Sequence, residues 1–123
     1  MKRGNKTTGL RLRVVLAPDI AIGPGKADIL DGIRETGSIA AAGRRLGMSY
    51  KRAWLLVETM NACFRTPLVE ATKGGSRGGG AALTPLGDEV LARFRRIEAA
   101  AQTAAAAELD ALAALLCDIA ERK

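Results

Sequence analysis

The sequence has no histidine, only two cysteines and only four aromatic residues, and each shortage excludes a class of protein. Because histidine is absent and Cys63 and Cys117 are far apart rather than in a C-x-x-C arrangement, no metal site and no cofactor are expected. No set of cysteines or carboxylates has a spacing typical of catalysis, which excludes an enzyme. Both cysteines lie in apolar helical patterns, so they are predicted to be core residues in a reducing, cytoplasmic compartment.

Long apolar runs are also missing. The first residues are basic, but Arg11 and Arg13 interrupt before any apolar stretch, so no signal peptide is expected. No segment is long and apolar enough to span a bilayer, and no membrane partner is expected. With so few aromatic rings the core must be built from Leu, Ile, Val and Ala, which favours packed helices over a β-sandwich. A chain of 123 residues can form one domain with an appendage.

Positive charge is what the sequence has in excess. Its net charge of +6 and its pI near 9.9 suit a polyanionic partner, either nucleic acid or an acidic membrane surface. The charge is concentrated in the middle of the chain. Residues 38–83 carry a net charge of +5, from Arg44, Arg45, Lys51, Arg52, Arg65, Lys73 and Arg77 against Glu58 and Glu70.

Local patterns predict the elements that precede this basic segment. Residues 1–9 contain almost nothing to bury and are predicted to form a disordered basic tail. Apolar and polar residues alternate over residues 10–16, which predicts a strand, and residues 20–22 predict a short second one. From Lys26 the apolar period becomes helical, and Gly37 supplies the stop of a first helix.

The basic segment itself predicts two helices and a hairpin. Ser38 is expected to cap a short second helix, and Ser49 a third helix that continues to about Phe64. Residues 68–83 then predict two strands joined by a basic, glycine-rich tip at residues 73–80. The inward face of the third helix is expected to hold Ala53, Trp54, Val57, Met60 and Phe64.

The last predicted helix is long. Thr84 as N-cap and Pro85 in the first position open it, and its pattern runs to about Ala120. At 1.5 Å per residue it would reach about 50 Å, further than so small a domain can cover. Its apolar stripe needs a partner surface, which predicts homodimerisation through Phe94, Ile97, Leu109, Leu112 and Leu116. Two alternatives stay open: the helix folds back on its own domain, or it recruits another protein and the chain is an interaction module.

Together these elements predict a mostly α fold with a small β content. It consists of a winged helix-turn-helix over residues 10–84 and a long C-terminal dimerisation helix over residues 85–120. The expected partners are double-stranded DNA and a second copy of the chain. No small-molecule effector is evident from the residues.

The predicted fold places the start of the third helix in a DNA major groove. There Lys51 and Arg52 can donate to guanine O6 and N7, and Ser49 and Tyr50 can reach phosphates or base edges. The alternative is an ordinary solvated first turn. Counting the second helix and the hairpin tip, the candidate DNA-binding residues are Ser38, Arg44, Ser49, Tyr50, Lys51, Arg52, Lys73 and Arg77.

The hairpin tip is predicted to approach the sugar-phosphate backbone. Its five glycines allow a close approach, and Lys73 and Arg77 supply positive charge. A hairpin without such a contact is the alternative. A nucleotide-binding P-loop is disfavoured, because the tip lacks the G-x-x-x-x-G-K-[ST] order and does not join a strand to a helix.

The motif S-Y-K-R-A-W at residues 49–54 is followed by Leu68-Val69-Glu70 and by the glycine-rich segment that ends in Ala81-Ala82-Leu83-Thr84. In these residues the chain resembles the N-terminal DNA-binding domain of the ModE family of molybdate-responsive regulators, which is similar to the winged helix of LysR-type regulators. The resemblance covers about residues 10–100. It implies a homodimer on an inverted repeat, with the third helix in the major groove and the wing on the neighbouring backbone. ModE proteins typically carry molybdate-binding modules after this domain, and this sequence ends at Lys123, so a stand-alone form that does not sense molybdate directly is expected.

Overall fold

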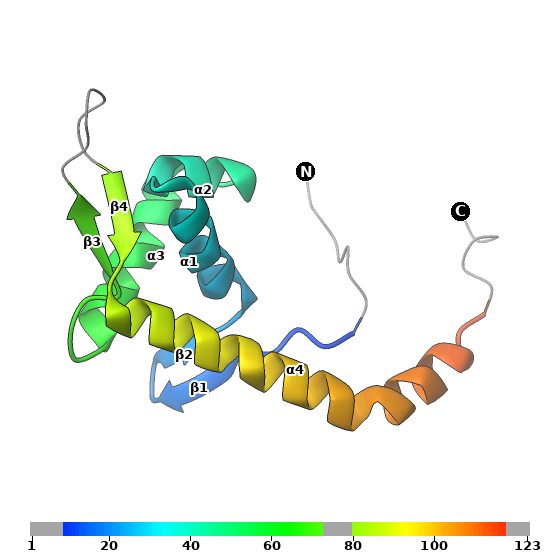
Figure 1. Cartoon of the computed structure of the whole chain (residues 1–123). Helices are drawn as coiled ribbons and strands as arrows, with labels where there is room; N and C mark the ends of the chain where they lie inside the picture. The colour runs from blue at the N-terminus through cyan, green and yellow to red at the C-terminus, as the bar shows by residue number, and fades with distance from the viewer. Residues whose placement is uncertain (1–8, 73–79, 118–123) are drawn as a thin grey trace.

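The computed structural model describes residues 9–72 and 80–117. Two short strands come first, and three helices, a second strand pair and a long helix follow (Figure 1). This order confirms the predicted fold class. The elements are β1 (Val14–Ala17), β2 (Ile20–Ile22), α1 (Pro24–Thr36), α2 (Ile39–Arg45), α3 (Tyr50–Cys63), β3 (Val69–Thr72), β4 (Gly80–Leu83) and α4 (Pro85–Ala114).

Small residues allow the first three helices to cross closely. A Cβ on Gly32 of α1 would lie 2.8 Å from the Cβ of Ala42 in α2, and one on Gly43 of α2 would lie 3.0 Å from the Cβ of Ala53 in α3. Any side chain at either glycine would push the helices apart, because helix axes approach only as near as the contacting residues permit. The α2–α3 turn contains Gly47 in the left-handed region, with φ of 73°.

The core lies between these helices and the first half of α4. Its largest fully buried side chains are Ile29, Leu30, Ile33, Met60, Leu68, Leu91 and Phe94. Two expectations are corrected here. Phe94, predicted in the dimerisation stripe, is only 2% exposed and packs in the domain's own core. Trp54, predicted to face inward, is 40% exposed, because the buried arc of α3 centres on Ala53, Val57 and Met60.

The β3–β4 hairpin, called the wing below, is held at both strands. Asn61 on α3 accepts hydrogen bonds from the backbone N–H of Leu68 (2.8 Å) and Val69 (3.1 Å) and donates to the carbonyl of Val69 (3.0 Å). On the other strand, the N–H of Ala81 donates to the carbonyl of Gly37 at 3.0 Å. The base of the wing is therefore fixed to both α3 and the α1–α2 turn. The predicted contacts of Lys73 and Arg77 fall outside the described residues.

The first strand is shorter than predicted. Residues 10–13 are not in a strand, because β2 offers only three residues as a pairing partner, from Val14 opposite Ile22 to Ala17 opposite Ile20. The preceding segment lies against α4 instead, where the N–H of Leu10 donates to the Gln102 side chain at 3.0 Å. The β1–β2 hairpin thus forms a sheet separate from that of the wing.

The last helix is continuous from Pro85 to Ala114 and leaves the globular part of the molecule, bending toward its C-terminal end (Figure 1). Thr84 caps it by accepting from the N–H of Gly87 at 3.0 Å, and Pro85 follows, as predicted. The helix ends at Ala114 rather than near Ala120, with a tighter last turn in which Leu115 donates to the carbonyl of Leu112. Within the described ranges, no helix combines the length and apolar content that crossing a membrane requires.

Candidate nucleic-acid interface

The first turn of α3, residues 49–52, is called the α3 head below. Ser49 caps the helix, and its Oγ accepts from the backbone N–H of Arg52 at 3.1 Å. The hydroxyl proton of Ser49 stays available to donate to another acceptor. Tyr50, Lys51 and Arg52 are exposed beside this cap, Tyr50 by 56%. A cationic helix start with free backbone donors is suited to an anionic ligand such as phosphate.

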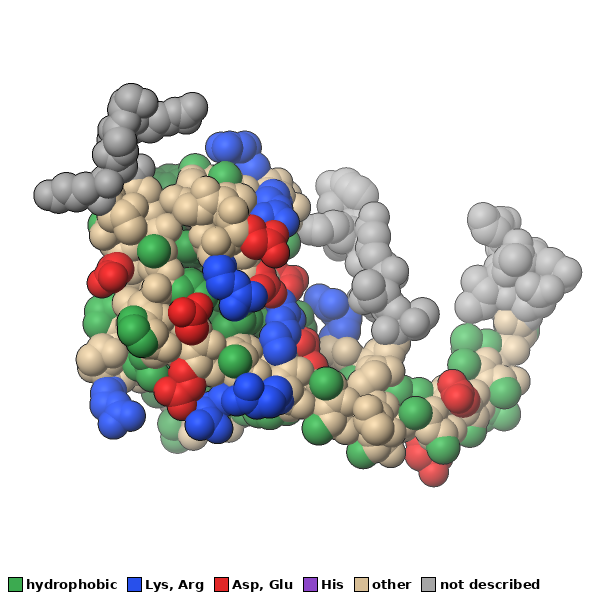
Figure 2. Space-filling model, viewed as in Figure 1, with side chains coloured by type: hydrophobic (Ala, Val, Ile, Leu, Met, Phe, Trp, Pro, Cys, Tyr) green, Lys and Arg blue, Asp and Glu red, His purple; other side chains and the backbone are tan. Residues whose placement is uncertain are grey.

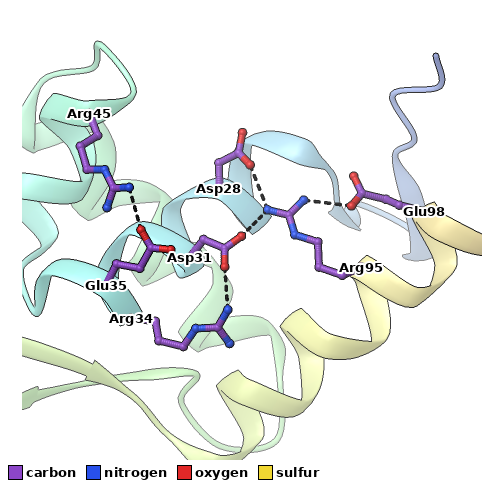
Figure 3. Close-up of polar contacts among 7 residues, drawn as sticks. All are labelled: Asp28, Asp31, Arg34, Glu35, Arg45, Arg95 and Glu98. Atoms are coloured by element: carbon purple, nitrogen blue, oxygen red, sulfur yellow. Dashed lines mark hydrogen bonds and ion pairs between the residues drawn. The ribbon is translucent and has the colours of Figure 1, made fainter. Parts of the chain in front are cut away.

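Four arginines elsewhere on the globular part are ion-paired with carboxylates, whereas Arg65 and Arg96 are exposed and have no carboxylate partner among the described residues. Arg45 at the end of α2 lies 2.7 Å from Glu35 of α1, and Arg93 lies 2.8 Å from Glu89 within α4. Arg34 is paired with Asp31 in the same way, as Figure 3 shows.

Arg95 of α4 is the centre of the largest charged cluster. Its guanidinium contacts Asp28 and Asp31 of α1 and Glu98 of α4 (Figure 3). Partial burial opposes the charged form of Arg95, but the hydrogen bonds that its guanidinium donates to the three carboxylates outweigh burial and raise the pKa of Arg95 above its usual range. The cluster joins α4 to α1, and the positive charge of Arg95 is matched by the three carboxylates.

The α3 head differs from these arginines. Within the described part of the chain, neither Lys51 nor Arg52 has a carboxylate partner, and the same holds for Arg44 near the end of α2. All three side chains are exposed. Their charge is therefore available to a ligand, whereas that of Arg34, Arg45, Arg93 and Arg95 is already matched.

Two hollows flank the α3 head. One, of about 260 Å³, is lined by Ser38, Ile39, Ala40, Tyr50, Gly80 and Ala81, and so brings α2, α3 and the start of β4 together. The other, called the α3 hollow, has a volume of about 230 Å³ and is lined by Ser49, Lys51, Arg52, Leu55, Leu56 and Thr59. The structure thus groups five of the predicted residues around one helix start. Ser38 also caps α2, accepting from the N–H of Ala41 at 3.0 Å.

The sequence interpretation missed Leu55, which lines the α3 hollow and is 48% exposed. A signal for it existed. Leu55 follows Lys51 by four residues, so it shares a helix face with a residue that was predicted to bind DNA.

The far half of α4, residues 99–114, carries a different surface. Leu109 is half-buried, while Leu112 and the neighbouring Leu115 and Leu116 beyond the helix end are exposed by 64%, 80% and 62%. Residues 99–117 contain no lysine or arginine, and Figure 2 shows hydrophobic and acidic side chains along this stretch. Of the predicted dimerisation residues, Ile97 is also exposed, by 44%. No group of three potential metal ligands occurs among the described residues.

Comparison with known proteins gives a consistent result. Residues 26–88, from α1 to the first turn of α4, match the bacterial regulatory helix-turn-helix proteins of the lysR family and make up just over half of the chain. The chain is 46% identical to the molybdenum-pterin-binding protein MopB of Rhodobacter capsulatus, over 63% of its own length and 29% of that protein. It is 36% identical to the transcriptional regulator ModE of Haemophilus influenzae, over 76% of its length and 36% of the relative.

The DNA-binding transcriptional dual regulator ModE of Escherichia coli is 38% identical over 55% of this chain and 26% of its own length. The chain therefore spans between about a quarter and just over a third of the length of these three relatives. The part that matches the lysR family contains nearly all of α1 together with α2, α3, β3 and β4, the elements that surround the α3 head.

Proposed function

Because the chain belongs to the bacterial regulatory helix-turn-helix proteins of the lysR family, we propose that it acts as a homodimer on an inverted-repeat DNA operator. Membership makes it a DNA-binding transcriptional regulator with a ModE-like domain, and not an enzyme. We assign base reading to the α3 head, DNA-backbone contacts to α2 and the wing, and dimerisation to the far half of α4. The regulator is proposed to act in the bacterial cytoplasm.

The observation that carries the proposal is the contrast among the cations. Lys51 and Arg52 are exposed and lack carboxylate partners within the described residues, whereas four other arginines are ion-paired. An exposed cation with no internal partner gains most from a polyanion, since binding releases the counterions of the nucleic acid. On a helix start, these side chains also reach the donor and acceptor edges that bases present in the major groove.

Phosphate contacts complete the surface. Ser49 can donate its hydroxyl proton, Tyr50 is exposed at the same helix start, and Arg44 and Ser38 lie on α2 next to it. Such contacts fix the position of a protein on the duplex without reading its sequence. The wing is fixed to α3 by Asn61 and to the α1–α2 turn by Ala81, so its tip, with Lys73 and Arg77, is proposed to follow the backbone beside the groove.

Dimerisation is proposed to bring two α3 heads to two half-sites. Ile97, Leu109, Leu112 and Leu116 form the proposed stripe, from which Phe94 is removed because it is buried in the domain. An isolated, exposed stripe of this kind marks an interaction site. A two-fold arrangement of the stripe gives an inverted repeat directly, because the operator mirrors the symmetry of the dimer.

The test uses an operator selected from a random duplex pool by the wild-type protein, and measures binding by fluorescence anisotropy. The double variant Lys51→Ala/Arg52→Ala should lose the preference for operator over scrambled duplex, because good base contacts each discriminate by about 1 to 3 kcal/mol. The matched control is Arg93→Ala/Arg96→Ala, which removes the same charge from exposed positions on α4. It should keep the preference.

Equal loss of preference in both double variants would indicate a general charge effect and contradict the assignment to the α3 head. Light scattering at micromolar concentration tests the second part of the proposal. A monomeric wild type would contradict dimerisation and favour the other candidate for the exposed leucines of α4, recruitment of a different protein.

A further inference from the structure

The outward face of α3 carries an apolar side chain among its cations. Leu55 is 48% exposed and follows Lys51 by four residues and Arg52 by three, so the three side chains lie on neighbouring positions of one helix surface. The core side of the same helix is formed by Ala53, Val57 and Met60, none more than 2% exposed. Leu55 is therefore not held in the domain core, and it lies directly beyond the α3 head, the surface proposed to read the bases.

The α3 hollow brings charged, polar and apolar side chains together around Leu55. Its lining combines two cations, two hydroxyl groups and two leucines within about 230 Å³. A phosphate alone would use the cations and hydroxyls and leave the leucines in contact with water. An apolar side chain of a protein partner would cover the leucines but would also desolvate Lys51 and Arg52 without supplying an anion, which is costly.

A ligand that suits the whole lining is anionic and carries a small apolar group. In duplex DNA, thymine has this property, because its 5-methyl group lies in the major groove between the phosphate backbones. Cytosine lacks the methyl group, and the purines present only polar atoms at the same edge. An apolar side chain beside a base can therefore distinguish thymine from the other three.

We infer that Leu55 reads a thymine of the operator through its 5-methyl group. The inference rests on the proposed placement of α3 in the major groove and adds a specificity-determining residue to it. Leu55 is four residue steps beyond Lys51, a distance of about 6 Å along the helix axis. Base pairs follow one another at about 3.4 Å. The thymine therefore lies within about two base pairs of the base that Lys51 contacts.

The experiment removes the methyl group from the DNA rather than from the protein. In the selected operator, each thymine of one half-site is replaced in turn by deoxyuridine, which lacks only the 5-methyl group. At one position the wild-type protein should bind about fourfold more weakly, the factor expected when one methyl group is no longer buried. Leu55→Ala should bind the thymine operator that much more weakly too, and should then be indifferent to the replacement.

Two further variants make the result specific. Leu55→Met keeps a long apolar side chain and should still distinguish thymine from uracil. Leu16→Ala removes a leucine of similar exposure, 54%, from β1, away from α3, and should leave the thymine-to-uracil ratio at its wild-type value. Thermal unfolding of all variants, followed by circular dichroism, checks that the fold is kept.

The outcomes separate this inference from the proposal on which it rests. If the random pool yields no enriched sequence, the proposed operator binding itself fails. If an operator is enriched but every uracil replacement leaves affinity unchanged, the assignment of Leu55 is overturned and operator binding stands. The same holds if Leu55→Ala weakens binding to the thymine and uracil operators equally, since Leu55 would then support the helix rather than read the base.

Discussion

The two halves of α4 have the same apolar periodicity and opposite environments. In the first half, Leu91 and Phe94 are at most 2% exposed, and Arg95 is held by three carboxylates. In the second half, Leu112 is 64% exposed. The first half thus belongs to the domain core, whereas the second half accepts a hydrogen bond from Leu10 through Gln102 and leaves Leu112 exposed. If α4 also mediates the proposed dimerisation, substitutions in its first half should affect the stability of the domain and substitutions in its second half should affect assembly.

The largest effect is expected at the packed end. Phe94→Ala should lower the free energy of unfolding by about 3 to 5 kcal/mol, because a buried ring is lost and a cavity remains. Urea unfolding of the purified variant measures this. Ile97→Ala, three residues along the helix and 44% exposed, is the comparison and should cost far less in dilute, monomeric protein. Similar losses from both variants would mean that Phe94 is not a core residue.

A second strong effect is expected where α4 begins. A Cβ on Gly87 would lie 2.1 Å from the carbonyl oxygen of Leu68, so a side chain there must displace the strand or the helix. Gly87→Ala should therefore destabilise the domain by about 1 to 3 kcal/mol, the usual cost of overpacking.

Gly25 in α1 is the matched control for Gly87. A Cβ at Gly25 meets nothing within 4 Å, and its φ is not in the left-handed region. Gly25→Ala should thus stabilise the protein slightly, by about 0.4 to 1 kcal/mol, through a less flexible unfolded chain. The two glycine variants should move the unfolding midpoint in opposite directions, and a shift of the same sign for both would contradict the close approach at Leu68.

These contrasts show what the sequence could predict. Helix caps depend on hydrogen bonds between residues that are close in the sequence. The N-caps of α2, α3 and α4 at Ser38, Ser49 and Thr84 were therefore predicted correctly. The periodic stripe of α4 was also identified. Periodicity, however, does not tell which surface covers a stripe, so Phe94 was assigned to a partner although the domain itself covers it.

The charged residues were harder still to predict. Arg44 and Arg45 are neighbours of the same type, yet Arg45 pairs with Glu35 ten residues away and Arg44 has no carboxylate partner within the described residues. The cluster at Arg95 joins residues 64 and 67 positions apart. Such pairings depend on how the helices cross, and helix crossing follows from close contacts such as that between Gly32 and Ala42.

At the exposed end of α4, assembly should be lost while the fold is kept. Leu112→Asp should weaken dimerisation at least tenfold, equivalent to about 1.4 kcal/mol, because an unpaired charge would be buried in an apolar contact. Analytical ultracentrifugation over a concentration series measures the dimer constant. Circular dichroism should show a nearly unchanged helical content, since this residue is not in the domain core. An unaltered dimer would place the contact elsewhere on the molecule.

A modest effect on stability is expected near the point where the two halves meet. Arg95 joins α4 to Asp28 and Asp31 of α1 (Figure 3), and we expect these ion pairs to help fix the direction in which the far half leaves the domain. Arg95→Met should lower the free energy of unfolding by only about 1 kcal/mol, because partly exposed ion pairs are screened by solvent.

The larger consequence of Arg95→Met should be on the operator spacing that the dimer accepts. One base pair inserted between the half-sites moves them by about 3.4 Å and rotates them, which a rigid wild-type dimer should tolerate poorly. The variant, with α4 less firmly held, should lose less affinity than the wild type for that operator. Arg93→Met, which breaks only the exposed pair with Glu89, should behave as the wild type, and equal spacing penalties for all three proteins would show that Arg95 does not set the direction of α4.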